Sequence, residues 1–176
     1  MLLEETSSFE LFFIDLIYWL FIQGLVGFIA AHRPQKRFNP ENWRYRTRKW
    51  EKDGRIYQDW FNIKHWKPLV FDAGRVFQRD FRKDHVNPAN PGNLERWIIE
   101  TCRAEWCHHI TFWFILPLTA FNPPALTQFW LLYDMVLNLV PIIVQRYNRP
   151  RLKKLLTGLQ CREKHPIQNS QSPVHS

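Results

Sequence analysis

Motifs that mark the common soluble enzyme classes are missing from this sequence of 176 residues. It has no GxSxG turn, no Walker or GxGxxG nucleotide-binding loop, and no HExxH zinc motif. Its three cysteines, at irregular spacing, form neither a disulfide framework nor the CxxC pair of a metal site. A soluble hydrolase, a nucleotide-dependent enzyme and a zinc peptidase therefore have no support.

Lysine and arginine are absent before Arg33, whereas the rest of the chain is strongly basic. The formal net charge is +8, and basic proteins usually bind nucleic acid or anionic lipid. Arginines alternate with aromatic residues at 42–46, a pattern that can stack on bases. The apolar segments described next favour lipid. Nucleic-acid binding, which would require a soluble protein, ranks last.

Three apolar blocks predict a mainly α-helical, small integral membrane protein with about three membrane helices. The blocks lie at residues 9–31, 102–121 and 126–145. Each approaches the roughly 20 residues that a helix needs to cross the hydrocarbon core. The mean hydropathy of the chain is slightly negative because basic segments separate the blocks. A cleaved signal peptide is the alternative for the first block, but the basic stretch that opens such a peptide is missing.

Residues 32–93 form a basic, tryptophan-rich segment between the first two blocks. From Arg33 to Lys67 there are eleven Lys and Arg against four Asp and Glu. This mixture suits the headgroup layer, where aromatic rings and cations meet anionic lipid. We therefore expect an interfacial segment, with short helices near 40–52 and 56–64.

The second apolar block is expected to continue a helix that begins outside the membrane. The proline- and asparagine-rich stretch from Asp84 predicts a loop, and Asn93 is a suitable N-cap for a helix starting at Leu94. Only the residues after Cys102 are strongly apolar. The second crossing is therefore short, and a re-entrant hairpin with the third block is the alternative.

The distribution of Lys and Arg predicts the orientation. The N-terminal residues are acidic, the turn at 122–125 is uncharged, and the central and C-terminal segments are basic. Because positive residues favour the cytoplasmic side, we expect a multi-pass cell-membrane protein with its N-terminus outside and its C-terminus in the cytoplasm. Residues 1–164 are predicted to form one domain, followed by a disordered tail at 165–176.

The densest polar cluster runs from Glu100 to His109. On a helix, Glu105 lies next to His108 and His109, three and four residues on, and Arg103 lies one turn after Glu100. A carboxylate beside an imidazole can orient it as the base that takes a proton from an attacking hydroxyl. The alternatives are a solvated helix-entry region and a metal site, although one helix supplies too few ligands for a metal.

Asp134 and Asn138 lie one turn apart inside the third apolar block. Buried polar groups in a membrane helix need partners. They would pair with His109 or Asp15, line a substrate pocket, or simply hold the helices together by hydrogen bonds.

A run of polar and basic residues follows the third block: Gln145, Arg146, Asn148, Arg149 and Arg151. Three guanidinium groups can form a fork for the phosphates of coenzyme A, of a phosphopantetheine carrier or of a lipid. The alternative is a positive-inside signal, which needs no substrate.

Trp66, Lys67 and Asp72 are a further candidate group in the basic segment. The indole ring can stack on a sugar face while the polar groups bind hydroxyls. Anchoring at the membrane interface is the commoner use of such a tryptophan.

Two long motifs carry a resemblance to a known family. They are Glu-Thr-x-Arg-Ala-Glu-x-x-His at 100–108 and Val-Gln-Arg-Tyr-Asn-Arg-Pro-Arg-Leu at 144–152. Shorter matches precede them in order: Tyr18-Trp19-Leu20, Gln23, Arg33-Pro34, Phe38, Trp60-Phe61, Trp66-Lys67, Asp72 and Ile98-Ile99. With these residues the chain resembles the glycosyl-4,4′-diaponeurosporenoate acyltransferases of staphyloxanthin-like carotenoid biosynthesis.

The resemblance implies a membrane acyltransferase that esterifies the glucose 6-hydroxyl of a glycosylated C30 carotenoid acid with a fatty acyl chain, the last step of such a pathway. The partners would be this lipid-like acceptor, an acyl thioester as co-substrate, the membrane and other carotenoid-pathway enzymes. No nucleic acid, metal or redox cofactor is expected. A transferase for another lipid or glycolipid acceptor and a non-catalytic membrane scaffold are the alternatives.

For this reaction we assign the general base to His108 with Glu105, and His109 is the alternative imidazole. The arginines after the third block are expected to bind the donor's phosphates. Glu100 and Arg103 are expected to orient the sugar or the donor. These assignments predict that the two long motifs meet in space.

Overall fold

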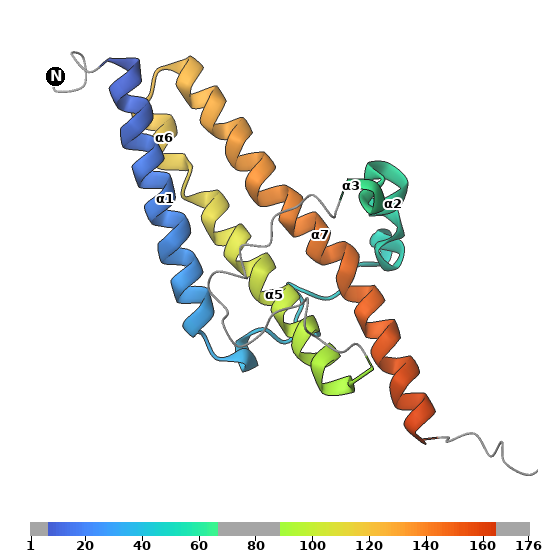
Figure 1. The fold of residues 1–176 in the computed structure, drawn as a ribbon. Coiled ribbons are helices and arrows are strands. Elements are labelled where there is room, and N and C mark those ends of the chain that lie inside the picture. The colour runs from blue at the N-terminus through green and yellow to red at the C-terminus, as the bar shows by residue number, and fades with distance from the viewer. Residues whose placement is uncertain (1–6, 67–88, 165–176) are drawn as a thin grey trace, which may run out of the picture.

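The computed structural model describes residues 7–66 and 89–164, which contain helices and no strands. The bundle is formed by the long helices α1 (Ser8–His32), α5 (Pro91–Trp113) and α7 (Pro124–Lys164), together with α6 (Leu116–Phe121), which has six residues. They form an antiparallel bundle in which α5 and α6 run between α1 and α7 (Figure 1). The short helices are η1 (Gln35–Arg37), η2 (Lys49–Gly54), α2 (Arg55–Phe61) and α3 (Ile63–Trp66). The mainly α fold is confirmed. The predicted tail at 165–176 lies outside the described residues.

Capping residues define both ends of α1. At its start, Ser7 Oγ accepts from the Glu10 backbone N–H at 3.3 Å, and Glu10 Oε2 accepts from the Ser7 backbone N–H at 3.0 Å. The helix ends at His32 because Pro34 disfavours a helical conformation for the residue before it. Arg33 is accordingly extended, with φ −73° and ψ 137°.

The second apolar block is divided between two helices. Pro117 lies in the first turn of α6. A proline ring clashes with the carbonyl four residues earlier, which here belongs to Trp113, the last residue of α5. The prediction of one continuous helix at 102–121 is therefore wrong. The expected N-cap Asn93 is also wrong: Asn90 caps α5, its Oδ1 accepting from the Gly92 N–H at 2.9 Å.

α7 continues far beyond the predicted end at residue 145. Its 41 residues span about 60 Å at roughly 1.5 Å per residue, which is about twice the hydrocarbon thickness of a bilayer. The extension persists because Leu152 packs in a buried cluster with Leu94 and Ile98 at the start of α5. The basic residues after position 145 therefore continue the same helix, α7, beyond its apolar half.

Two of the described helices, α1 and α7, are long and apolar enough to cross a membrane, judged by length and composition. α5 is not among them, since acidic and basic residues lower its hydropathy and α6 is separated from it. Of the roughly three membrane helices that we expected, two, α1 and α7, are therefore supported by length and composition.

The bundle buries polar side chains and exposes apolar ones. Asp15, Asp134 and Asn138 are 4%, 1% and 0% exposed. The exposed side chains of α1 and α7 include large apolar residues: Phe13, Ile17, Phe21, Phe28, Leu132, Met135 and Val136. Water-soluble bundles show the opposite distribution. This surface is compatible with lipid around the two long helices.

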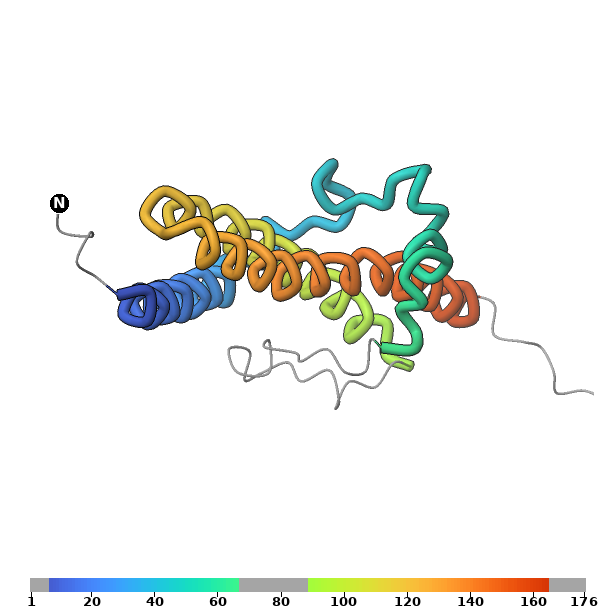
Figure 2. The backbone as a smooth tube through the Cα atoms, turned by 90° about the horizontal axis from the view of Figure 1, so that it is seen from above, coloured from blue at the N-terminus to red at the C-terminus, as the bar shows by residue number. Residues whose placement is uncertain are grey.

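The basic segment after α1 packs against the bundle instead of lying only on a membrane surface. Phe38 and Tyr45 are buried with Cys102 of α5, and Tyr57 and Ile63 are buried with Tyr147 of α7. Figure 2 shows the segment leaving the end of α1 and reaching α2 and α3 beside α7. Exposed indole rings remain at its surface for the expected interfacial role: Trp43, Trp50 and Trp60. The predicted short helix near 56–64 corresponds to α2 and the start of α3.

Gly54 brings this segment into contact with α7, so Gly54→Ala should destabilise the protein. Its φ of +80° costs any other residue about 1–2 kcal/mol. An added Cβ would also lie 3.2 Å from the carbonyl oxygen of Tyr147 and 3.3 Å from the ring of Pro150, neither of which can move freely. We expect a lower melting temperature for the detergent-solubilised protein, measured by thermal unfolding.

Gly158→Ala is the matched control for this prediction. Gly158 lies on α7, where an added Cβ would meet nothing within 4 Å, and alanine favours a helix by roughly 0.5–1 kcal/mol over glycine. Equal melting temperatures for Gly54→Ala and Gly158→Ala would contradict the close approach between η2 and α7.

Candidate functional site

Among the described residues, Arg149 is the most buried cation, with 1% exposure. Its Nε donates to Thr101 Oγ1 at 2.9 Å, and its Nη1 donates to the Tyr45 carbonyl at 2.6 Å. Its Nη2 donates to the Thr101 carbonyl at 3.1 Å and to Glu105 Oε2 at 2.5 Å. Four hydrogen bonds from one guanidinium join α5, α7 and the segment after α1. The side chain is fixed within the protein.

Arg146, one turn earlier on α7, bridges two buried carboxylates. Its Nε donates to Glu105 Oε1 at 2.8 Å and its Nη1 to Glu51 Oε1 at 3.1 Å, while Nη2 also donates to the Arg44 carbonyl at 2.7 Å. Glu51 and Glu105 are each 1% exposed. Two carboxylates thus balance two guanidinium groups. We call Glu51, Glu105, Arg146 and Arg149 the inner charge cluster.

Tyr57 completes the surroundings of Glu51, because its hydroxyl donates to that carboxylate. Burial, and then the hydrogen bond to Glu51 and its negative charge, raise the pKa of Tyr57 well above its ordinary value. The phenol therefore stays protonated and remains a hydrogen-bond donor. Because every buried charge in the cluster has a partner, breaking one pair leaves the other charge uncompensated.

Arg103 and Glu100 hold the end of α1. The Arg103 Nε donates to Glu100 Oε2 at 3.0 Å. Its Nη1 donates to the backbone carbonyl of Ala30 and, at 2.9 Å, to that of Arg33. These carbonyls lie at the C-terminal end of α1, where backbone carbonyls carry partial negative charge. The Ala30 carbonyl also accepts from the Arg33 backbone N–H at 3.3 Å. Both residues, expected to orient substrate, thus make contacts within the chain.

The remaining polar residues after the third apolar block are also placed. Arg151 Nη1 donates to the Tyr147 carbonyl at 2.6 Å, and its guanidinium lies 3.5 Å from the Tyr147 ring centroid. Gln145 and Asn148 are half-buried on α7. The guanidinium groups of this run therefore do not form a fork directed at a ligand. Arg146 and Arg149 face the interior, and Arg151 lies along its own helix.

His108 belongs to a different group, the middle hydrogen-bond chain. Its Nδ1 lies 3.0 Å from Asn138 Oδ1, and Asn138 Nδ2 donates to Asp134 Oδ1 at 2.7 Å. Trp19 of α1 reaches the same Asp134 oxygen with its Nε1 at 3.5 Å. The expected pair of Glu105 with His108 is not formed. The imidazole instead contacts Asn138 of α7, and Asn138 in turn pairs with Asp134. Pairing of these two residues with His109 or Asp15, one of the expected arrangements, does not occur among the described residues.

The order of this chain matches one of the two neutral tautomers of His108. A carboxylate accepts hydrogen bonds, so the Asn138 NH₂ group faces Asp134 and the Asn138 carbonyl oxygen faces the imidazole. His108 Nδ1 must then carry the proton, which makes Nε2 the basic nitrogen of the neutral ring. The arrangement can therefore accept a proton from a hydroxyl at Nε2.

Asp134 keeps one oxygen without a partner. Its Oδ2 is buried and accepts no hydrogen bond from any described residue. A buried carboxylate oxygen in this state costs free energy unless a ligand or water donates to it. Nearer the turn between α6 and α7, Asp15 is instead satisfied by Asn122, whose Nδ2 donates to Asp15 Oδ2 at 2.7 Å. Asp134 is therefore the acidic group with spare capacity in the middle of the bundle.

His109 and Trp66 lie away from this chain. The His109 Nε2 is 3.7 Å from Glu105 Oε1, and the side chain is 52% exposed. Trp66 donates to the Phe61 carbonyl at 2.6 Å and packs beside Tyr57 and Ile63. Lys67 and Asp72 lie outside the described residues. Among the residues described, no three His, Cys, Asp or Glu side chains gather as metal ligands would.

Four contributors to these groups were not predicted from the sequence: Glu51, Tyr57, Thr101 and Trp19. Glu51 had a usable signal, since acidic residues are scarce between Arg33 and Lys67. Trp19 and Thr101 stand in the stretches that carry the family resemblance, although no role was predicted for them. Tyr57 has no distinguishing signal, because a tyrosine is an ordinary residue in such a segment.

Comparison with known proteins places both groups in a recognised sequence region. The sequence model of a family described as glycosyl-4,4′-diaponeurosporenoate acyltransferase matches residues 41–158. Proteins with the same description in Staphylococcus aureus strains USA300 and MRSA252 are 36% and 35% identical over 152 residues, covering 85% of this chain and 90% of each relative. No solved structure matches the chain. The matched region contains the inner charge cluster and, Trp19 excepted, the middle hydrogen-bond chain.

Proposed function

Because this chain belongs to the glycosyl-4,4′-diaponeurosporenoate acyltransferase family, we propose that it esterifies the sugar of glycosyl-4,4′-diaponeurosporenoate with a fatty acyl chain. Acyl transfer in a carotenoid pathway follows from the family itself. The finer claim concerns the acceptor atom, the primary hydroxyl at carbon 6 of the sugar. The hydrogen bond between His108 and Asn138 carries the mechanism, because it gives the imidazole the tautomer of a base.

The reaction then needs one proton relay. His108 Nε2 removes the proton from the sugar hydroxyl while its oxygen attacks the carbonyl carbon of an acyl thioester. The C–O bond forms, the C–S bond breaks, and the departing thiolate takes the proton back from the imidazolium. The thioester supplies the driving force. No redox step or metal is required by this balance.

Asn138 and Asp134 act as positioning residues for His108. Asn138 holds the Nδ1 side of the ring, and Asp134 fixes the orientation of the Asn138 amide. The vacant hydrogen-bonding capacity of Asp134 Oδ2 suits a second hydroxyl of the sugar. A carboxylate that accepts from a sugar hydroxyl would orient the acceptor in the bundle.

We place the chemistry at the inner side of a membrane-embedded bundle. α1 and α7 would cross the bilayer with the N-terminus outside, and the basic half of α7 would lie in the cytoplasm. The carotenoid and the acyl chain would lie against the exposed apolar faces of these helices. The contacts of Glu105, Arg146 and Arg149 support a structural role for the inner charge cluster in place of phosphate binding.

Incubation of the reconstituted protein with competing acceptors tests this function. The bilayer would contain glycosyl-4,4′-diaponeurosporenoate and a lysophospholipid, and labelled acyl groups would be supplied as coenzyme A and carrier-protein thioesters. We expect the label in an acylated glycosyl carotenoid. Label in the phospholipid would indicate the alternative acceptor class, and no transfer at all would support a scaffold.

A further inference from the structure

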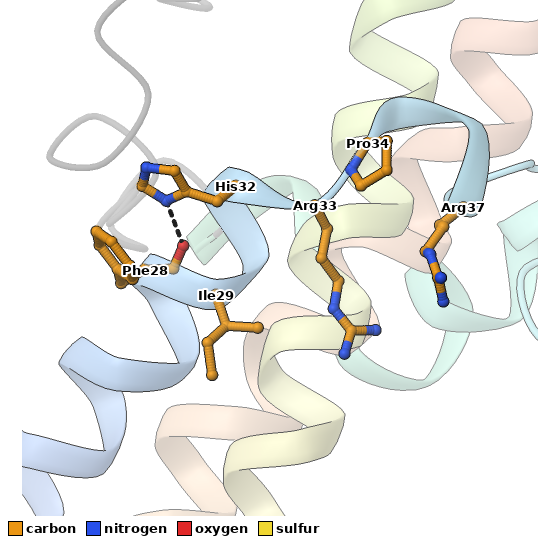
Figure 3. A pocket seen from close by; sticks show the side chains of 6 residues that line it. All are labelled: Phe28, Ile29, His32, Arg33, Pro34 and Arg37. Atoms are coloured by element: carbon orange, nitrogen blue, oxygen red, sulfur yellow. Dashed lines mark hydrogen bonds between the residues drawn. The ribbon is translucent and has the colours of Figure 1, made fainter.

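The end of α1 carries two cations outside the inner charge cluster. Arg33 follows the last residue of α1, and Arg37 closes the short helix η1 that follows Pro34. Because Pro34 and η1 turn the chain at this point, both side chains border one shallow hollow of about 410 Å³. Figure 3 shows the two guanidinium groups extending in the same direction from the turn. The volume falls within the roughly 300–1,000 Å³ of small-molecule sites.

Both guanidinium groups keep their hydrogen-bonding capacity. Arg33 stacks 4.3 Å from the ring centroid of Trp106, and stacking leaves the in-plane N–H groups of a guanidinium available. Neither Arg33 nor Arg37 makes a side-chain hydrogen bond or ion pair in the parts of the chain described, 7–66 and 89–164. Arg146 and Arg149 differ from them, because both are paired with buried carboxylates.

The electrostatic environment of the hollow favours an anion. The end of a helix normally repels anions because its last carbonyls carry partial negative charge. Here Arg103 donates to the carbonyls of Ala30 and Arg33. His32 Nδ1 lies 2.8 Å from the Phe28 carbonyl and covers it. The helix end is therefore neutralised, and the charges of Arg33 and Arg37 are not offset.

The same hollow has an apolar side. Phe28 and Ile29, on the last turns of α1, line it and are 57% and 38% exposed. An adjoining pair of cations and apolar side chains matches a molecule that carries both a phosphate and an acyl chain. Arg103, which contacts this helix end, precedes His108 by five residues on α5, or about 7.5 Å along the axis. The helix end that borders the hollow therefore lies roughly one and a half turns of α5 from His108.

We infer that Arg33 and Arg37, with Phe28 and Ile29, form a binding site for the phosphate group of an acyl-bearing molecule. Two molecules share this chemistry, an acyl thioester of coenzyme A and an acidic phospholipid. For the thioester, the inference rests on the proposed acyltransferase function and gives the donor site. For the phospholipid, it is independent of that function.

Arg37→Gln is the most suitable variant, because Arg37 is exposed and its removal breaks no other contact. Lys36→Gln is the matched control: it removes the same charge from the same short helix, but Lys36 does not line the hollow. Binding of a long-chain acyl-coenzyme A would be measured with the full-length protein in phosphatidylcholine nanodiscs. A second series would measure retention of phosphatidylglycerol by native mass spectrometry.

We expect Arg37→Gln to weaken binding roughly tenfold, as the loss of one charge-assisted hydrogen bond implies, and Lys36→Gln to leave it unchanged. An effect on acyl-coenzyme A identifies the thioester as the ligand, and an effect on phosphatidylglycerol alone identifies the phospholipid. Unchanged binding of both probes by Arg37→Gln, or equal weakening by Lys36→Gln, overturns the site.

His108→Gln separates this inference from the proposed function. The variant should bind acyl-coenzyme A like the unaltered protein but form no ester. If the unaltered protein forms no ester while binding still depends on Arg37, the function fails and the site stands. If the unaltered protein forms ester but Arg37→Gln binds acyl-coenzyme A as tightly as the unaltered protein, the inferred site is wrong and the proposed function stands.

Discussion

Replacing His108 with glutamine should lower the rate of ester formation by about 10²–10⁴-fold, the usual contribution of a general base. Glutamine can still donate a hydrogen bond to Asn138, so the packing between α5 and α7 should persist. It cannot accept and return the proton. The rate would be measured with reconstituted protein. Equal amounts of the variant and the unaltered protein would be used, each taken from the folded fraction of a size-exclusion column in detergent.

Two comparisons make this result interpretable. His109→Gln should cause a smaller loss, because that imidazole is half-exposed and faces Glu105. Asn138→Leu should lower kcat by about 10²-fold through misplacement of the His108 ring, with little change in the KM of the thioester. A larger loss from His109→Gln than from His108→Gln would transfer the role of base to His109.

Arg149→Met should be among the most destabilising single substitutions in the protein. It removes four hydrogen bonds and leaves Glu105 with one fewer buried counter-charge. Breaking a buried ion pair from one side costs about 3–5 kcal/mol, which corresponds to roughly 10 °C in melting temperature for a chain of this size. Thermal unfolding in detergent measures the effect.

Controls distinguish this structural role from donor binding. Arg151→Met should lower the melting temperature less, because that guanidinium makes one hydrogen bond, to the Tyr147 carbonyl of its own helix, and lies beside Gly54 without an ion pair among the described residues. Adding Glu105→Gln to Arg149→Met restores charge balance, leaving Arg146 with Glu51. The double variant should therefore be more stable than the sum of the two single losses implies. A normal melting temperature for Arg149→Met, with a raised KM for the donor, would contradict the structural role.

The helices of this protein were predictable from local patterns, but their ends were less so. The apolar blocks located α1 and the first half of α7. Asn93 was predicted to cap α5, but the helix begins at Pro91 with Asn90 as its cap, because proline favours the first helical position. The end of α7 depends on packing between Leu152 and the start of α5, which a hydropathy pattern does not contain.

The contacts of the candidate site, too, were predictable only where they lie within one helix. Helical spacing correctly brought Glu105 near His109, and the sequence correctly selected Asp134 and Asn138 as buried polar residues. Spacing could not show that Arg146 and Arg149 face Glu105 from a helix some forty residues away. It also could not show that the scarce carboxylate Glu51 is buried with them. Partners that come from distant segments are set by tertiary packing alone.

These contacts change the meaning of the basic run after the third apolar block. From its sequence, the run can be interpreted as a phosphate fork or as a signal for membrane orientation. In the structure, Arg146 and Arg149 of this run join α7 to α5 and to the segment after α1. Arg33 and Arg37, the cations that we infer to bind a ligand, come instead from the end of α1, where a proline ends the helix.

The pigments of a host that makes glycosyl-4,4′-diaponeurosporenoate test the central claim most directly. We predict that expressing this gene adds one fatty acyl group to the mass of the glycosylated pigment, and that the His108→Gln variant leaves the mass unchanged. An unaltered pigment mass in cells whose membranes contain the folded, unsubstituted protein would contradict the proposed acyl transfer.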